Sequence, residues 1–391
     1  MGRSSAPIYR YLVGHEIAPP ISCHHSLTKL VFHYATELFE GLKAYRGTDG
    51  HIRLFRPQLN MERMRRSARR AALPDFDGSE LLQCIRELVF HYASELFEGL
   101  KAYRGTDGHI RLFRPQLNME RMRRSARRAA LPDFDGSELL QCIRELIRID
   151  EAWVPHQKGA SLYIRPTIIG TDPKLGVSPS QQAKLFVITG PVGAYFKTFS
   201  PISLFADAQY IRAAKGGVGA FKMGCNYAPT MHVGVQAIKK GCHQVLWLYG
   251  AKHYVTEAGA MNIFMYWKNE YGEDELITPS IESGLILPGI TRQSILDLSH
   301  EMGGFKVTER DFTMDEVKKA LNENRVYEMF GSGTAVVVVP INRILYAIDG
   351  REEVLSFPTT DGNRSLMQRF FNLLQDIQFG RLKRPEWTVE V

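Results

Sequence analysis

The sequence has few cysteines, no long apolar run and little excess of charge of either sign. Its 391 residues include 5 cysteines, none in a CxxC pair, so neither a disulfide framework nor a zinc or other metal site is expected. No stretch approaches the roughly 18 uninterrupted apolar residues that a membrane span requires. Lysine and arginine number 49 against 42 acidic residues, an excess too small to indicate nucleic-acid binding. We therefore expect a soluble globular protein of about two domains, without nucleic-acid or membrane partners.

A tandem duplication occupies the first part of the chain. Residues 31–88 and 89–146 are the same sequence at an offset of 58, and they differ only at Thr36 and Ser94. Repeat folds stack about three or more diverged units, so two copies this alike indicate a recent duplication or a misjoined gene. The second copy runs directly into IRIDEAWVP and the rest of the chain. We expect 89–146 to take the native place and 31–88 to be surplus, extruded as loop or disorder.

Each copy predicts the same short series of elements. An apolar stretch (LFEGLKAY) precedes a turn at GTDG, a short strand, a basic helix and a second helix. The basic helix, at 118–128 and again at 60–70, has five arginines to one glutamate. We interpret it as a solvated helix face and leave open that one arginine meets a phosphate.

Beyond residue 150 strands and helices alternate as in a two-domain α/β enzyme. Strands are predicted at 160–170, 183–190, 243–249 and 260–267, and a strand, glycine turn and strand at 325–340. A capping box, TMDE, predicts a helix start at Thr313, and a last helix is predicted from about Ser365 to Gln378. We divide the chain into 1–30 (unassigned), 31–88 (surplus copy), 89–192 (small α/β domain), 193–201 (linker) and 202–391 (large domain).

The most informative segment is the glycine-rich stretch around Lys222. Glycines let the backbone turn sharply and approach a ligand closely. A lysine in a tight, partly dry loop is a candidate for a Schiff base, because desolvation lowers its pKa and frees the amine. A lone lysine is more often a solvated surface residue, so the functional interpretation of Lys222 depends on the other segments that accompany it.

Three other segments support a functional role for Lys222. LPGIT, before a helix, predicts either an anion-binding site or a plain helix entry. GSGT, between two apolar runs, predicts either an anion-binding nest or a hairpin turn. Glu257 ends an apolar strand, where a carboxylate is costly unless it is paired, and a protonated pyridine nitrogen is one such partner. Together these features suggest pyridoxal 5′-phosphate.

The segments that carry these features resemble one family. LFEGLKAYRG, LFRPQLNMERM, SLYIRPT, GPVGAYF, KMGCNY, QVLWLYG, TEAGAMNIF, LPGITRQS and MFGSGTA are similar, in order and spacing, to the branched-chain amino-acid aminotransferases of fold-type IV. The resemblance covers about residues 89–391. It implies an α/β (α+β) fold with a smaller N-terminal α/β domain, a larger C-terminal domain and the cofactor between them. It also implies a homodimer that moves the amino group of leucine, isoleucine or valine to 2-oxoglutarate.

Site residues follow from the resemblance motif by motif. Lys222 would be the catalytic Schiff-base lysine, which also shuttles the proton. Tyr227 would hydrogen-bond the phenolic oxygen of the cofactor and Glu257 its ring nitrogen. The phosphate would be held by Arg121, Arg212, Thr334 and the backbone of Ile290 and Thr291. The substrate would meet Phe97, Tyr163, Arg165, Tyr195 and Ala335, with Tyr92, Leu175 and Val177 supplied by the partner subunit.

The sequence also departs from the family. Ala260 stands where the family has a threonine three residues after the glutamate, and Val336 and Val339 replace the CxxC of some members. Residues 1–30 do not resemble the family's N-terminal strand region, so we expect that strand to be absent. Arg3 and Arg10, with no acid before Glu16, are mildly like a mitochondrial presequence, which leaves a cytoplasmic or mitochondrial location open.

Two other interpretations of function remain at this point. Another fold-type IV enzyme, a D-amino-acid aminotransferase or an aminodeoxychorismate lyase, would share the cofactor motifs, although SLYIRP and GPVGAYF favour the branched-chain enzymes. The second alternative is that the chain is not catalytic, because the extra copy disturbs its small domain.

Overall fold

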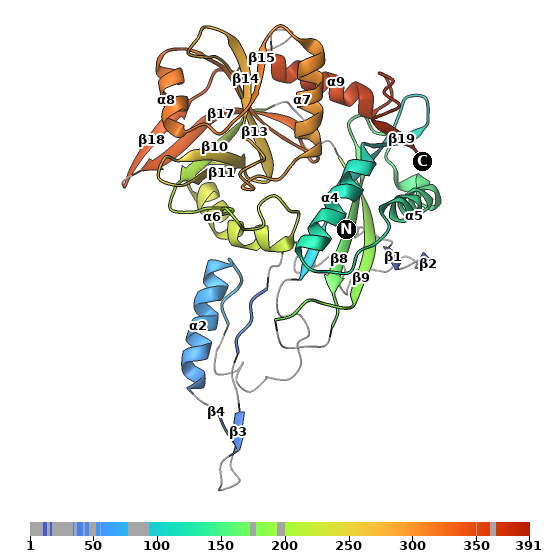
Figure 1. The fold of residues 1–391 in the computed structure, drawn as a ribbon, viewed down its shortest axis with the longest axis vertical. Coiled ribbons are helices and arrows are strands. Elements are labelled where there is room, and N and C mark those ends of the chain that lie inside the picture. The colour runs from blue at the N-terminus through green and yellow to red at the C-terminus, as the bar shows by residue number, and fades with distance from the viewer. Residues whose placement is uncertain are drawn as a thin grey trace, which may run out of the picture.

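The computed structural model describes residues 11–13, 16–17, 34, 37–41, 44–46, 52–54, 56–76, 94–172, 177–193, 200–348, 350–359 and 365–391. Two domains lie side by side, each built around its own sheet (Figure 1). None of the described helices is long and apolar enough to cross a membrane.

The small domain is an antiparallel sheet covered by two helices. Its strands run in the order β19-β7-β6-β8-β9-β1-β2, with β5 also on β8. The bounds are β1 Tyr11–Val13, β2 Glu16–Ile17, β5 Glu95–Phe97, β6 Leu100–Arg104, β7 Ile110–Phe113, β8 Ser161–Gly170, β9 Ala183–Val192 and β19 Thr388–Glu390. The covering helices are α4 (Pro115–Arg128) and α5 (Gly136–Ile149), and a short 3-10 helix, η1 (Glu151–Trp153), follows. Apolar side chains at helical spacing on α5 (Leu139, Ile143 and Leu146) pack with α4 onto the sheet.

The large domain is a mixed sheet that closes on itself. Its order is β12-β11-β10-β17-β16-β13-β14-β15, and because β12 also pairs with β13, the strands from β12 to β13 form a closed barrel. The bounds are β10 Ile202–Asp207, β11 Gln244–Tyr249, β12 Tyr254–Ala258, β13 Met261–Lys268, β14 Asp274–Thr278, β15 Lys306–Glu309, β16 Val326–Gly333, β17 Val337–Ile348 and β18 Arg351–Ser356. The helices around it are η2 (Gly224–Asn226), α6 (Ala228–Lys239), α7 (Ile290–Met302), α8 (Met314–Asn322) and α9 (Leu366–Gln378).

The local signals in the sequence predicted several of these elements well. The strands expected at 160–170, 183–190, 243–249 and 260–267 correspond to β8, β9, β11 and β13. The capping box is confirmed, since the Thr313 hydroxyl accepts from the Glu316 amide and the Glu316 carboxylate from the Thr313 amide. The last helix is confirmed with Ser365 as its N-cap.

Two long-range strand pairings were not predicted. Tyr11–Val13 pairs with β9, so the expectation that residues 1–30 contribute no strand was wrong. The C-terminal strand β19 pairs with β7, which places it in the small-domain sheet although the sequence analysis assigned 202–391 to the large domain. Both pairings join segments far apart in the chain, which local patterns do not reveal.

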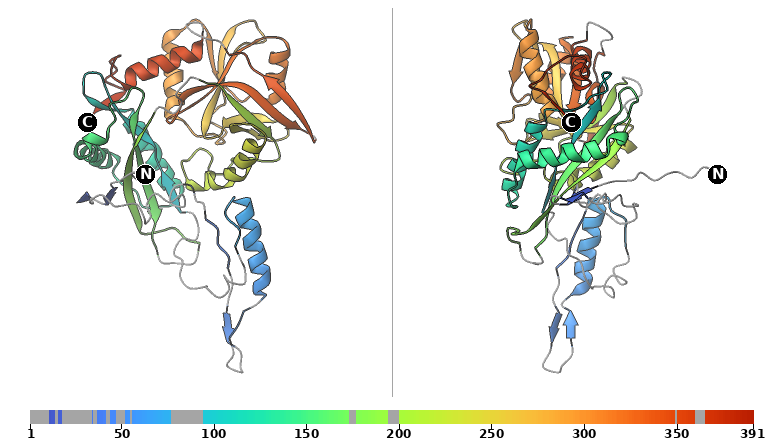
Figure 2. Two further views of the ribbon diagram at one scale, coloured as in Figure 1. Left: turned by 180° about the vertical axis from the view of Figure 1, so that it is seen from behind. Right: turned by 90° about the vertical axis from the view of Figure 1, so that its right-hand side faces the viewer.

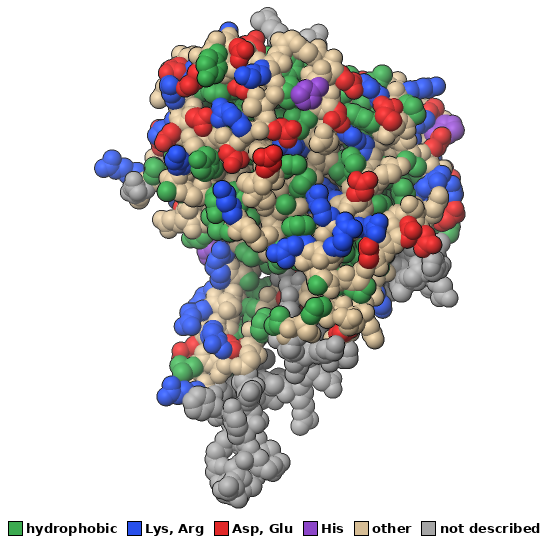
Figure 3. Space-filling view, in the orientation of Figure 1, with side chains coloured by type: hydrophobic (Ala, Val, Ile, Leu, Met, Phe, Trp, Pro, Cys, Tyr) green, Lys and Arg blue, Asp and Glu red, His purple; other side chains and the backbone are tan. Residues whose placement is uncertain are grey.

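The two copies of the duplicated sequence have different positions. The small domain uses the second copy for β6, β7, α4 and α5. The first copy forms a hairpin of β3 (Ala44–Arg46) and β4 (Ile52–Leu54) and a helix, α2 (Pro57–Arg70). Its described part is therefore folded, not extruded loop. Helix α2 stands outside both domains and touches α6 (Figure 2), and Figure 3 shows the basic side chains that it carries.

Candidate active site

Lys222 lies where the two domains meet. It belongs to the glycine-rich segment of the large domain that leads into η2, and its backbone is held by the small domain. Its amide donates to Ser125 Oγ of α4 at 2.9 Å, and its carbonyl accepts from the Phe97 amide of β5 at 3.2 Å. Its Nζ donates to the Tyr227 hydroxyl at 3.1 Å and lies 4.7 Å from the centre of the Phe97 ring. The expected glycine-rich segment therefore holds its lysine between α4 and β5 of the small domain, beside the Tyr227 hydroxyl.

The surroundings of the lysine make its amine nucleophilic. Burial lowers the pKa of Lys222 to about 8, and the nearby Arg121 cation acts in the same direction. Burial raises the pKa of the Tyr227 hydroxyl, which therefore stays protonated at neutral pH and can donate or accept a hydrogen bond. A neutral amine beside a neutral phenol can attack a carbonyl carbon, as the sequence suggested for Lys222.

The lowered pKa predicts how the reactivity of Lys222 depends on pH. Trapping of a small aldehyde on Lys222 with borohydride should increase about tenfold from pH 7 to pH 9, because the neutral fraction of an amine with a pKa of about 8 rises over that interval. Peptide mass spectrometry measures the modified fraction. Exposed Lys319 is the internal comparison: Glu270 raises its pKa, so its neutral fraction stays small at both pH values but rises about tenfold per pH unit without levelling off near pH 8. Parallel profiles for the two lysines would contradict the prediction.

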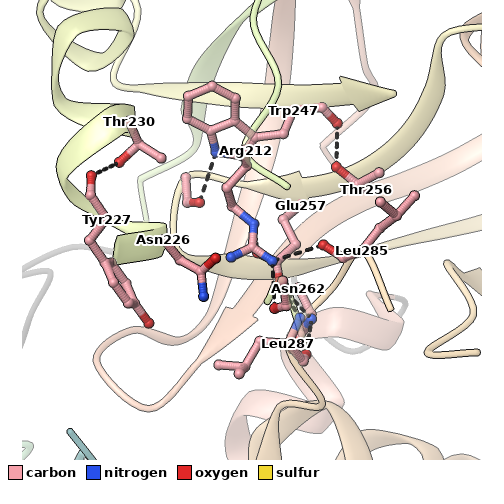
Figure 4. Close-up of polar contacts among 12 residues, drawn as sticks. Arg212, Asn226, Tyr227, Thr230, Trp247, Thr256, Glu257, Asn262, Leu285 and Leu287 are labelled. Carbon is pink, nitrogen blue, oxygen red and sulfur yellow. Dashed lines mark hydrogen bonds and ion pairs between the residues drawn. The ribbon is translucent and has the colours of Figure 1, made fainter. Parts of the chain in front are cut away.

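Glu257 is buried at the end of β12, and each of its oxygens has a partner, which leaves lone pairs for a further donor (Figure 4). One carboxylate oxygen accepts from the Leu287 amide at 2.8 Å, and the other lies 2.7 Å from Arg212 Nε, a close ion pair that is not aligned as a hydrogen bond. Burial raises the pKa of Glu257, while Arg212 opposes that rise. The partner that the sequence required for this carboxylate is thus present within the chain. Arg212 also donates to the carbonyls of Gly219 and Leu285 and fixes the loop before α7.

Arg121 brings a second cation to the same loop. Its guanidinium forms a two-pronged ion pair with buried Glu98, at 2.7 and 2.8 Å, and donates to the Pro288 carbonyl at 3.1 Å. Pro288 lies two residues before α7, which begins at Ile290 and has no side-chain cap on its first amides among the described residues. Open amides and the positive end of the helix dipole attract an anion. The structure thus places Arg121 at the start of the helix that contains Ile290 and Thr291, and the phosphate assignment stays a prediction.

The GSGT segment is a hairpin, one of the two predicted possibilities. Residues 331–333 complete β16, and the turn that follows contains Thr334 and Ala335. The Ala335 carbonyl accepts from buried Lys101, whose pKa burial lowers to about 8. Val337 has φ 62°, a strained conformation for a β-branched residue. Ser332 Oγ, near the end of β16, is buried without a hydrogen-bond partner among the described residues, so the strand end beside this turn can still bind a polar ligand group.

Aromatic rings surround Arg165 near the Lys222 amine. The guanidinium of Arg165, on β8, lies 4.5 Å from the centre of the Phe97 ring and 5.1 Å from that of Tyr163. Its Nη2 donates to the Tyr163 hydroxyl at 2.9 Å. Gly99 lets this hydroxyl approach, since a β-carbon there would lie 2.3 Å from it. Phe97, Tyr163 and Arg165 are therefore grouped as expected.

Four of the predicted substrate residues either lie outside the described residues or are exposed. Tyr92, Leu175 and Tyr195 lie outside the described residues. Val177 is described and its side chain is 85% exposed. Ala260 is exposed in the tight turn between β12 and β13.

Sequence reasoning missed four residues that support the site. Glu98 pairs with Arg121, Lys101 holds the Ala335 carbonyl, Ser125 holds Lys222, and Asn262 donates to Glu257 at 3.3 Å and to the Leu287 carbonyl at 2.8 Å. Glu98 carried a usable signal, a carboxylate within an apolar run, which was applied only to Glu257. The other three are ordinary polar residues whose partners lie far away in the chain.

The fold and the site together define a class of enzyme. A nucleophilic amine lies between two domains, near a buried carboxylate and an open helix N-terminus. The family model for amino-transferase class IV matches residues 95–344, which include all of these groups. Enzymes of this class use pyridoxal 5′-phosphate. The orphaned Ser332 hydroxyl and the uncapped amides of α7 fit its phosphate, and the Glu257 carboxylate fits its ring nitrogen.

Comparisons with individual proteins narrow the class. The chain is 58% identical over 306 residues to a cytosolic branched-chain-amino-acid aminotransferase of Caenorhabditis elegans, covering 78% of this chain and 74% of the relative. It is 54% identical to a mitochondrial one of Rattus norvegicus, covering 77% and 76%. The solved branched-chain aminotransferase of Thermoproteus uzoniensis matches with a TM-score of 0.62 and 25% identity, covering 76% of this chain and 90% of that one. The chain belongs to the branched-chain-amino-acid aminotransferase family.

Membership makes the chain a transaminase that acts on small molecules with pyridoxal 5′-phosphate. A second solved branched-chain aminotransferase, which matches with a TM-score of 0.61 and 25% identity, was determined with pyridoxamine 5′-phosphate. The relatives include both cytosolic and mitochondrial forms, the two locations that the sequence left open.

Proposed function

We propose that this chain reversibly transfers the amino group of L-leucine, L-isoleucine or L-valine to 2-oxoglutarate, giving branched-chain 2-oxo acids and L-glutamate. The observation that carries the proposal is the position of Lys222. Its amine, with a pKa of about 8, points at the Tyr227 hydroxyl in an aromatic pocket between the domains.

Each part of the site has a role in this reaction. The cofactor supplies an electron sink for the carbon that loses its proton. Lys222 would hold the cofactor through its aldehyde, and as a free amine it would move the proton at the reacting carbon of the substrate. Tyr227 would position the lysine and the phenolic oxygen, and Glu257 would keep a proton on the ring nitrogen. Arg121 and the first amides of α7 would bind the phosphate.

The pocket can receive two kinds of side chain in turn. Phe97 and Tyr163 offer an apolar wall to a branched aliphatic chain. Arg165 lies at this wall, its Nε is buried without a partner, and no described carboxylate forms an ion pair with it. A buried guanidinium without a counter-ion favours a carboxylate ligand. The distal carboxylate of glutamate is that ligand in the second half of the reaction.

We also propose that the active unit is a homodimer. Val177 leaves an apolar side chain 85% exposed on the loop that follows residues 173–176. In a dimer this loop, with Tyr92 and Leu175, would complete the pocket of the partner subunit. Light scattering during gel filtration measures the mass, and a monomeric, fully active enzyme would contradict this part of the proposal.

The function is tested by substrate panels on the purified protein loaded with pyridoxal 5′-phosphate. Leucine, isoleucine and valine should each be converted with 2-oxoglutarate, and glutamate with the branched 2-oxo acids in reverse. D-alanine and aminodeoxychorismate are the comparisons, because the alternative fold-type IV activities would use them. Turnover of either comparison in preference to leucine would overturn the proposal. Loss of all activity despite covalent cofactor would instead identify a non-catalytic member.

A further inference from the structure

A residue of the first copy lies in the active-site pocket. The Tyr34 ring is 5.4 Å from the Phe97 ring in an edge-to-face arrangement and 5.4 Å from the Tyr227 ring. Phe97 and Tyr227 are the two rings that flank the Lys222 amine. Tyr34 therefore belongs to the aromatic cluster around the lysine, although 31–88 was expected to be surplus.

The hydroxyl of Tyr34 contacts Arg165. Arg165 Nη2 donates to the Tyr34 hydroxyl at 3.1 Å, and the guanidinium carbon lies 5.4 Å from the centre of the Tyr34 ring. The same nitrogen donates to Tyr163 at 2.9 Å, so two phenols hold one edge of the guanidinium. Holding that edge leaves the rest of the guanidinium free to receive a carboxylate in a fixed direction.

We propose that Tyr34 is a specificity residue of the pocket. Its ring closes the apolar wall for the aliphatic side chain, and its hydroxyl fixes Arg165 for the distal carboxylate of glutamate or 2-oxoglutarate. This inference rests on the proposed function. It assigns a role to the first copy, which supplies the tyrosine from the same chain that carries Lys222.

Tyr92, the twin of Tyr34, is the competing residue. The two tyrosines have the same neighbours, VFHYA, so local sequence does not distinguish them. The described contacts with Phe97, Tyr227 and Arg165 are those of Tyr34. Separate substitutions at the two positions decide which of them acts.

The test compares Tyr34→Phe, Tyr34→Ala and Tyr92→Phe in the full-length holoenzyme. Tyr34→Phe removes the hydroxyl and keeps the ring, so KM for glutamate should rise about tenfold while KM for leucine stays within twofold, because a hydrogen bond to a charged group is lost. Tyr34→Ala should raise KM for both substrates. Tyr271→Phe, on a side chain that is 86% exposed, is the matched control and should change neither constant.

A binding measurement separates this inference from the proposed function. Glutarate carries both carboxylates of glutamate without the amino group, so it should raise the melting temperature of the wild-type protein whether or not the protein turns over leucine. Tyr34→Phe should weaken that stabilisation, with about tenfold more glutarate needed. A Tyr34→Phe variant with unchanged KM for glutamate and unchanged affinity for glutarate overturns the inference. If Tyr92→Phe weakens both instead, the role belongs to Tyr92. Absence of leucine turnover in the wild type overturns the proposed function alone.

Discussion

Substituting Lys222 by alanine should lower the kcat of transamination at least about 10³-fold. The same substitution should abolish covalent attachment of the cofactor. The amine is the group that both anchors the aldehyde and moves the proton, and its Nζ contacts the Tyr227 hydroxyl at 3.1 Å, with no second amine described in such a contact. Leucine-dependent formation of glutamate measures the activity. Borohydride reduction followed by mass spectrometry measures the attachment.

The control for Lys222→Ala is Lys252→Ala, a substitution of an exposed lysine in the turn before β12. That variant should keep both activity and attachment. Cofactor-free Lys222→Ala should unfold at a urea concentration no lower than that of the wild type, because it removes an amine whose charged form burial disfavours. Retained covalent cofactor in Lys222→Ala would refute the assignment of the lysine.

Glu98→Ala should produce the largest loss of stability, about 3–5 kcal/mol, because it leaves the Arg121 guanidinium buried without its counter-ion. Burial alone would raise the pKa of Glu98, but Arg121 lowers it below its ordinary value. The pair therefore stabilises the protein fully above the unfolded pKa, about 4.3, and this stability is lost as the pH falls through the lower, folded pKa. Urea unfolding at neutral and acidic pH measures both effects, and the difference from wild type should shrink in acid.

The duplication supplies the control for Glu98→Ala within the same chain. Glu40 and Arg63 form the same pair in the first copy, with Arg63 Nε 2.7 Å from the carboxylate. The Glu40 side chain is 6% exposed, but that of Arg63 is 60% exposed, so Arg63 stays hydrated when its partner is removed. Glu40→Ala has the same neighbours in sequence and should leave the urea midpoint nearly unchanged. Equal losses for the two variants would show that burial does not decide the contribution of the pair.

The sequence identified those site residues whose chemistry shows in local motifs. Lys222 follows from the glycines around it, and the capping box and the last helix follow from side chains three or four residues apart. Glu257 was recognised as a carboxylate that needs a partner, but Arg212 as that partner was not. The two residues are joined only when β12 and the segment that follows β10 come together. Tyr34 is the extreme case, since its site partners Phe97, Arg165 and Tyr227 all lie outside its own copy.

The two copies separate what the sequence determines from what the tertiary structure decides. Both begin their basic helix with proline after an arginine at φ 47°, and in both an arginine of that helix pairs with the glutamate of LFEG. These interactions need only partners within the copy, so the same residues form them twice. Burial differs, because it needs β8 and β19 from outside the copy, and each sheet position accepts one strand. The copy continuous with β8 becomes the wall of the active site, and its twin remains outside the two domains, with Tyr34 reaching the pocket.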